Sequence, residues 1–307
     1  MDLSLRKMYR RYKRLRRERE EREREESEQR RSDGSDEPDE IREIRQDPVR
    51  LLTLAGFTPD PWQVEFIRST SKREILLCSR QTGKTTISAA KALATALTRR
   101  RCDVLVFSRA LRQSVEFLRR ASWFWAQSGK LLAAVTENKT EVEFENGSRI
   151  ISLPGNPNGV VGFSAGLVII DEASRVMDDL YYFVRPMVAA TNGDMIALST
   201  PFGKRGWFFS EWEGLGADGK PKATGTDPWK RTKITALDCS RLSAKFLEES
   251  RASMGEMFFN QEFMCEYVDT VMGVFPQWAI DRAMSDAVAE VEWGRKFETG
   301  PHEKLFV

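Results

Sequence analysis

The chain has 307 residues, of which 41% are hydrophobic and 31% are charged, and its formal net charge is +2. This composition excludes a wholly disordered chain, and the length allows one large domain or two modest ones. The apolar runs fall far short of the ~18 residues of a membrane-spanning helix, and the charged N-terminus lacks the apolar segment of a signal peptide. We therefore expect a protein that is neither secreted nor bound in a membrane.

The cysteine and histidine content predicts neither disulfides nor a zinc site. The four cysteines form no CxxC pair, and the single histidine is His302. Such spacing is typical of free thiols in a reducing cytoplasm.

Residues 1–43 are predicted to form a charged tail that is largely disordered or a solvated helix. Residues 1–17 carry eight Lys/Arg against one Asp, whereas residues 18–43 are net acidic and cancel that charge. No apolar residue occurs between Arg16 and Glu40, so this stretch cannot offset its ordering entropy by burial. The basic part suits either a helix that docks on a partner or on nucleic-acid phosphates, or a solvated arm.

After Ile41, short apolar runs alternate with helical periodicity. Periodic apolar residues predict helices over Lys84–Thr98 and Leu111–Gln127. Strands that alternate with helices predict an α/β fold with a mostly parallel sheet and helices on both faces. The predicted strands are Ile75–Ser79, Asp103–Ser108, Glu141–Glu145 and Arg149–Leu153 (a hairpin across Asn146-Gly147), Leu167–Asp171, Met195–Ser199 and Arg231–Ala236.

The most informative stretch runs from Ile75 to Thr86: an apolar strand, a tight loop, and Gly-Lys-Thr at the start of a helix. In such a loop, backbone N–H groups cradle a triphosphate, Lys84 reaches its β and γ oxygens, and the Thr85 hydroxyl ligates Mg²⁺. Cys78 stands where the pattern G-x-x-x-x-G-K-[ST] has its first glycine. The predicted nucleotide-binding residues of the loop are Ser79, Arg80, Gln81, Thr82, Gly83, Lys84, Thr85 and Thr86.

A second element supports the phosphate loop. Leu167–Asp171 is an apolar strand that ends in two carboxylates, Asp171 and Glu172. In a parallel sheet these acids reach the edge where the loop lies. We expect Asp171 to hold Mg²⁺ through water and Glu172 to polarise the attacking water.

Two further signals are weaker. Gln63 lies upstream of the loop in Pro59-Asp-Pro-Trp-Gln63, and a glutamine amide can read adenine, but a helix start with a packed tryptophan explains the same residues. Ser199, Thr200 and Pro201 follow another apolar strand, either opposite the γ-phosphate or in a simple turn.

Together these motifs resemble the large terminase subunit of tailed double-stranded DNA bacteriophages. The resemblance covers residues 45–280 and includes Leu153-Pro-Gly-Asn-Pro-Asn158, Gly162-Phe-Ser-Ala165 and Phe259-Asn-Gln-Glu262. It implies a P-loop NTPase of the additional-strand, catalytic-glutamate type that hydrolyses ATP to drive viral DNA into a procapsid. Expected partners are double-stranded DNA, the portal protein, a small terminase subunit and further copies in a ring, all in the host cytoplasm.

By position, the resemblance assigns Gln63 to adenine, Lys84 and Thr85 to phosphates and Mg²⁺, Asp171 to the metal, and Glu172 as the base. It also makes Arg80 a cis-acting arginine near the nucleotide, since guanidinium matches phosphate oxygens. The sequence Ser199-Thr200-Pro201 matches the motif that couples γ-phosphate loss to movement.

The chain departs from the family in two places. Many relatives have an arginine where this chain has Val161, and Arg149, Arg109 and Arg112 are the candidates for its role towards a neighbouring subunit. Large terminases also carry a nuclease domain of roughly 150 residues. We therefore expect a P-loop ATPase core over 44–224, a lid or linker subdomain over 225–275, and in 276–307 only the start of a truncated or absent nuclease.

Two other functions remain open. A superfamily 2 helicase shares the upstream glutamine, phosphate loop and Asp-Glu-Ala, but needs a second RecA-like domain. A nucleotide-binding ring adaptor would retain ATP without turnover. The basic residues Lys204, Arg205 and Lys220 are candidates for DNA contact.

Overall fold

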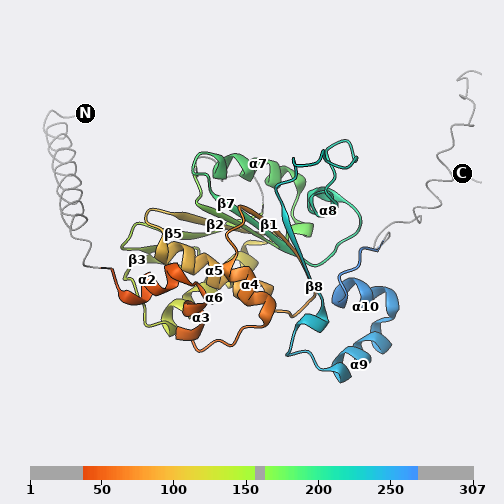
Figure 1. Cartoon of the computed structure of the whole chain (residues 1–307), viewed down its shortest axis with the longest axis horizontal. Coiled ribbons are helices and arrows are strands. Elements are labelled where there is room, and N and C mark those ends of the chain that lie inside the picture. The colour runs from red at the N-terminus through yellow and green to blue at the C-terminus, as the bar shows by residue number, and fades with distance from the viewer. Residues whose placement is uncertain (1–36, 156–162, 269–307) are drawn as a thin grey trace, which may run out of the picture.

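The computed structural model describes residues 37–155 and 163–268, and this part of the chain contains an eight-stranded sheet with helices on both sides (Figure 1). The strands are β1 (Arg73–Cys78), β2 (Asp103–Ser108), β3 (Ala134–Glu137), β4 (Glu141–Phe144), β5 (Arg149–Pro154), β6 (Leu167–Asp171), β7 (Asp194–Ser199) and β8 (Lys230–Ile234). The helices are α2 (Asp39–Gln46), α3 (Val49–Leu54), α4 (Pro61–Arg68), α5 (Lys84–Thr98), α6 (Leu111–Gln127), α7 (Asp178–Ala189), α8 (Gly206–Glu213), α9 (Ala244–Met254) and α10 (Glu256–Phe263), with 3-10 turns η1 (Ala173–Arg175) and η2 (Ala236–Asp238).

The strand order is β3-β4-β5-β2-β6-β7-β1-β8, and all neighbours from β5 to β8 are parallel. The register pairs Ser108 with Asp171, Asp171 with Leu198, and Leu77 with Ser199. The carboxyl ends of these strands therefore meet at one edge of the sheet, as the predicted parallel arrangement requires.

The predicted strands are all present, with ends that differ by one or two residues. The hairpin is confirmed, because β4 and β5 pair antiparallel with Glu141 opposite Ile151. The structure adds β3, which the sequence did not predict. Most of its residues, including Val135, are exposed, so it lacks the alternation that marks a half-buried strand.

Successive residues of the strands enter two separate apolar cores. In β1, Leu76 packs with α2 to α6 on one face, whereas Ile75 and Leu77 pack with α7 and α8 on the other. Figure 1 shows these two helical layers on either side of the sheet. The predicted doubly covered sheet is thus confirmed, and helices α5 and α6 have the predicted bounds.

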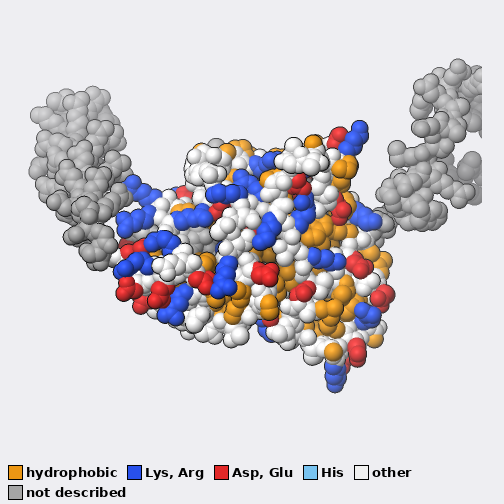
Figure 2. All heavy atoms as spheres, in the orientation of Figure 1, with side chains coloured by type: hydrophobic (Ala, Val, Ile, Leu, Met, Phe, Trp, Pro, Cys, Tyr) orange, Lys and Arg blue, Asp and Glu red, His pale blue; other side chains and the backbone are white. Residues whose placement is uncertain are grey.

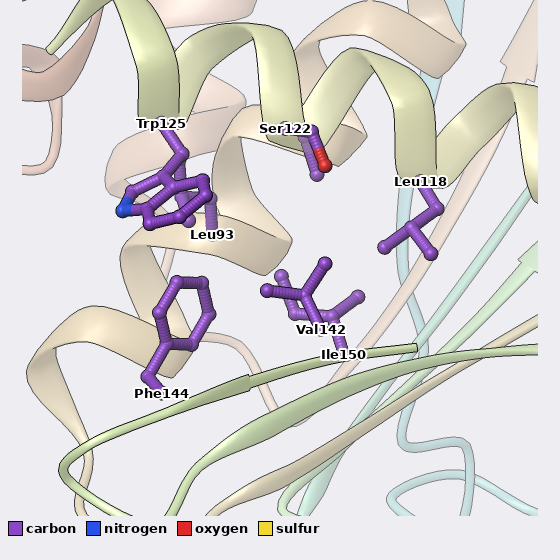
Figure 3. Close-up of a pocket in the computed structure, with 8 residues that line it drawn as sticks. Leu93, Leu118, Ser122, Trp125, Val142, Phe144 and Ile150 are labelled. Carbon is purple, nitrogen blue, oxygen red and sulfur yellow. The ribbon is translucent and has the colours of Figure 1, made fainter. Parts of the chain in front are cut away.

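The first core is tightly packed between α6 and the hairpin. Trp125 meets Phe144 edge to face, with ring centroids 5.7 Å apart, and its indole N–H donates to the carbonyl of Leu132 over 3.0 Å. Figure 3 shows Leu93, Trp125 and Phe144 converging between α5, α6 and the strands. These apolar contacts fix the hairpin against the parallel part of the sheet.

The packed part of the chain begins before residue 44, where we placed the end of the tail. Helix α2 starts at Asp39, and its side chains Ile41 and Ile44 are fully buried against the first core. Their spacing of three residues places both on one helix face, so a short apolar pair is enough to anchor this segment. The remaining tail and the segment 276–307 lie outside the described residues.

Strand β8 belongs to the main sheet, and only the chain after it forms a small unit of its own. Helices α9 and α10 pack around Phe259 and Phe263, apart from the sheet at the lower right of Figure 1. Helix α9 buries none of its residues. Figure 2 shows hydrophobic atoms exposed over α9 and α10, where Phe246 and Phe258 lie at the surface.

Among the described residues, every helix is too short or too polar to cross a bilayer.

Candidate active site

The phosphate loop connects the buried strand β1 to α5 through residues 79–83. Gly83 has φ 85°, and a Cβ there would lie 3.0 Å from Nε2 of Gln63, so only glycine fits. The hydroxyl of Thr82 closes the loop by donating to the carbonyl of Ser79 over 3.1 Å. Cys78 replaces the usual first glycine without strain, because it still belongs to β1 and pairs with Ile234.

Lys84, the first residue of α5, forms an ion pair with Glu172, with 3.0 Å between Nζ and Oε1. Burial would lower the pKa of the Lys84 ammonium, but the carboxylates of Glu172 and Asp171 outweigh burial and raise it. The side chain of Lys84 is 10% exposed and that of Glu172 is 24% exposed. This ion pair therefore holds a charged lysine at the mouth of the phosphate loop.

Asp171 ends β6 beside the loop and accepts a hydrogen bond of 3.0 Å from the Thr85 hydroxyl. Burial raises the pKa of the Asp171 carboxyl to about 6, although Lys84 acts in the opposite direction. A hydroxyl and a carboxylate in contact are hard oxygen donors of the kind that Mg²⁺ prefers. A divalent cation here would also compensate the buried negative charge, so the residues present fit the metal.

Glu172 adopts a left-handed backbone conformation, with φ 53° and ψ 42°. Such a conformation costs a non-glycine residue on the order of 1 kcal/mol or more and often occurs at functional sites. It turns the chain sharply between β6 and η1. The strain thus accompanies the turn that places the Glu172 carboxylate against Lys84 rather than along the strand.

Gln63 lies behind the phosphate loop and is fully buried. Its side-chain oxygen accepts from the backbone N–H of Asp60 over 2.9 Å, and its amide donates to the carbonyl of Thr82 over 3.3 Å. Arg241 donates to the same carbonyl over 2.8 Å and pairs with Asp60. In this structure Gln63 therefore supports the loop, as the helix-start interpretation of the sequence suggested; no sequence signal pointed to Arg241.

Arg80 faces α10 in this structure. Its guanidinium forms an ion pair with Glu262, and its backbone N–H donates to the Glu262 carbonyl over 3.0 Å. The backbone N–H of Ser79 donates to Ile234 of β8 over 2.7 Å. The phosphate loop is thus bonded to both sides of the small helical unit, a link that no local sequence pattern predicts.

The ends of β6 and β7 are joined by hydroxyl groups. Ser174 contacts the Ser199 hydroxyl over 2.7 Å and donates to the carbonyl of Thr200 over 2.9 Å. The Thr200 hydroxyl is buried without a hydrogen-bond partner. The residue after the candidate base and the predicted coupling motif therefore lie in direct contact, before the chain turns at Pro201.

The candidate arginines differ in their surroundings. Arg149 pairs with Asp103 at 2.6 Å and with Glu141 at 3.4 Å, at the amino end of β2 and β5, away from the phosphate loop. This engagement argues against Arg149 as the replacement for Val161, which lies outside the described residues. Arg109 and Arg112 are exposed beyond the carboxyl end of β2.

One further arginine approaches the loop helix. Arg120 of α6 donates from Nη1 to the Thr86 hydroxyl over 2.8 Å. The sequence predicted Thr86 as a nucleotide contact but gave no reason to select Arg120.

A protein-family comparison matches residues 75–282 to the model of the terminase large subunit, T4likevirus-type, N-terminal. This region is more than half of the chain. The chain belongs to the terminase large subunit family. A comparison of this terminase with curated proteins gives no match.

Solved terminase structures share its fold. The large terminase ATPase domain of Thermus phage P74-26 has a TM-score of 0.61 at 18% identity, over 71% of this terminase and 97% of that chain. The large terminase of a thermophilic bacteriophage in complex with ADP gives 0.57 at 12% identity, over 69% and 54%. The large terminase of bacteriophage HK97 gives 0.56 at 16% identity, over 73% and 54%.

This terminase therefore spans about half the length of the last two structures. At these identities the likeness concerns the fold, and the predicted P-loop ATPase fold is confirmed.

Proposed function

We propose that this terminase hydrolyses ATP with Mg²⁺ and uses the reaction to move double-stranded viral DNA into a procapsid. One observation carries the proposal: Lys84 and Thr85 of the phosphate loop contact Glu172 and Asp171 at the end of β6. A cation for the phosphates, donors for a metal and a second carboxylate for water thereby surround one point.

The triphosphate would bind along the N–H groups of the loop and of the first turn of α5, where the helix dipole favours an anion. Lys84 would contact the β and γ oxygens. Gln63 retains one amide N–H for adenine, because its oxygen and other N–H serve the fold. We keep Arg80 as a contact for the nucleotide when its ion pair with Glu262 opens.

Thr85 and Asp171 would hold Mg²⁺, with water and phosphate oxygens completing its shell. The metal neutralises charge on the phosphates and orients the γ-phosphate. The hydroxyl and carboxylate already lie 3.0 Å apart, so little rearrangement of the chain is needed to bind it.

Glu172 is the general base in this proposal. With no phosphate to bind, Lys84 pairs with Glu172, and an arriving triphosphate offers Lys84 a stronger anionic partner. The exchange releases the Glu172 carboxylate to orient and deprotonate the attacking water. Substrate binding and activation of the base are thus parts of one event.

Two links would carry the loss of γ-phosphate to other parts of the chain. Ser174 joins the residue after the base to Thr200, and Arg80 joins the phosphate loop to Glu262 of α10. We propose that the region after β8, within 225–275, moves as the lid of the ATPase core over 44–224. A nuclease start in 276–307 remains a prediction.

The membership of the family also guides the proposed partners. We infer that this terminase works in a ring on the portal protein, with a small terminase subunit, in the cytoplasm of the infected host. Contacts with DNA are expected to involve phosphates and to be independent of sequence.

The test measures ATP turnover by this chain with Mg²⁺, alone, with duplex DNA, and with duplex DNA and portal-bearing procapsids. We expect stimulation by procapsids and loss of turnover in Glu172→Gln. The exposed Glu116→Gln, which removes the same charge far from the loop, serves as the control. Stimulation only by single-stranded DNA with strand separation would identify a helicase instead, and ATP binding without turnover an adaptor.

A further inference from the structure

Two arginines beside the candidate active site pack on the same aromatic ring. The guanidinium carbon of Arg175 lies 4.1 Å from the centroid of Phe202, and that of Arg205 lies 5.6 Å from it. Both distances are within the range of cation–π interactions. Phe202 thus holds two positive charges close together, in spite of their mutual repulsion.

Neither arginine has an ion-pair partner among residues 37–155 and 163–268. Many other arginines there do, for example Arg68 with Asp47 and Arg99 with Asp194. The nearest element with acids is the start of α7, where Asp178 accepts the backbone N–H of Trp207 over 2.9 Å. The charges of the arginine pair are therefore stacked but not neutralised.

The location of the pair links it to the reaction. Arg175 lies in η1, three residues after Glu172, and Phe202 lies two residues after Thr200. Ser174 binds the carbonyl of Thr200, so the two segments that carry the pair are joined at the active site. A displacement of either segment during hydrolysis would change the position of at least one guanidinium.

We propose that Arg175 and Arg205, held by Phe202, bind backbone phosphates of duplex DNA. The inference rests on the proposed function and deepens it by placing a DNA contact. A guanidinium stacked on a ring keeps its N–H edge free, and that edge matches two phosphate oxygens. Arg205 is exposed, so the DNA backbone can reach the pair without opening the core.

The test is binding of a fluorescein-labelled 30-base-pair duplex, followed by anisotropy over a series of salt concentrations. Each lost phosphate contact lowers the slope of log K against log salt by about 0.9, so R175A/R205A should lower it by about 1.8. At 0.1 M salt this corresponds to a loss of affinity on the order of 10- to 60-fold. Phe202→Leu keeps both charges and should give a smaller loss by releasing the stacked geometry.

The matched control is R185A/R251A. It also removes two arginines that lie over rings, Tyr181 and Phe259, but at other places in the fold. This control should leave the slope within about 0.5 of the wild-type value, since neither residue adjoins the active site. A thermal melt verifies folding, and Arg205→Ala alone, at an exposed position, replaces the double variant if that variant does not fold.

The outcomes separate this inference from the proposed function. Wild-type protein that binds duplex DNA, together with an R175A/R205A variant of equal affinity and slope, overturns the inference alone. Wild-type protein that neither hydrolyses ATP nor binds duplex DNA overturns both. Unchanged DNA affinity with reduced DNA-independent turnover would assign the pair to the nucleotide instead, and so would also overturn it.

Discussion

Replacing Glu172 by Gln should produce a protein that binds ATP more tightly than the wild type while losing turnover. Without nucleotide, Lys84 and Glu172 form an ion pair of 3.0 Å in a largely buried setting. ATP must break this pair before Lys84 can contact phosphate. The neutral amide of glutamine holds the ammonium less strongly, so part of that cost disappears.

The size of the effect follows from the exposure of the pair. Glu172 retains 24% exposure and Lys84 10%, so the pair is worth more than a surface ion pair but less than a fully enclosed one. We take about 1 to 2 kcal/mol, which corresponds to a gain in ATP affinity of roughly 5- to 30-fold. Loss of a general base lowers turnover by about 10²- to 10⁴-fold.

Isothermal titration with ATP and Mg²⁺ measures the affinity, and phosphate release measures turnover. Glu116→Gln, which removes an exposed carboxylate that contacts only Arg119, should change neither quantity. Equal or weaker ATP binding by Glu172→Gln would refute the competition between Glu172 and phosphate. Turnover within about threefold of wild type would refute the assignment of the base.

Four other substitutions test separate parts of the structure. Lys84→Ala should weaken ATP binding by about 10- to 100-fold in the same titration, because a charged hydrogen-bond donor to phosphate is lost. Gln63→Ala removes two hydrogen bonds behind the phosphate loop, and should lower the free energy of unfolding by about 1 to 3 kcal/mol in urea titrations, even without nucleotide. Phe144→Ala opens the first core and should cost about 3 to 5 kcal/mol by the same method; a loss below 1 kcal/mol would mean that the hairpin is not packed as described. The hydrogen bond from Arg68 lowers the pKa of Asp47, so its stabilisation is present above about pH 4 and is lost as the pH falls. Asp47→Asn should therefore lower the melting temperature more at pH 7 than at pH 3, and an equal change at both values would exclude this contribution.

Local sequence patterns predicted the central fold well. The apolar strand Leu167–Asp171 and the helices α5 and α6 have strong period-two or period-3.6 signals, and the structure places all three as expected. The short edge strand β3 and the helix α7, which contains Pro186, lack clear signals and were not predicted. Their formation depends on packing against the sheet rather than on their own residues.

The candidate site divides in the same way. The sequence located Lys84, Asp171 and Glu172 because backbone geometry ties the phosphate loop and the adjacent strand end to particular residue types. Arg241 and Glu262 contact the loop from positions far along the chain, and only the fold brings them there. Gln63 shows a further limit, since one sequence context allowed a ligand contact or a structural role, and its contacts within the protein serve the latter.

Both outer strands of the sheet are unsuited to pairing with a further strand. Strand β3 has four residues and an irregular register with β4, and β8 carries Lys230, Arg231 and Lys233 along five residues. Short strands, bulges and basic side chains discourage edge-to-edge aggregation. Copies of this terminase can therefore be crowded around a common axis without merging their sheets, and any contact between them has to be made by helices, loops and side chains. Such contacts can loosen and re-form in each cycle, whereas a continuous sheet across subunits would fix them in place.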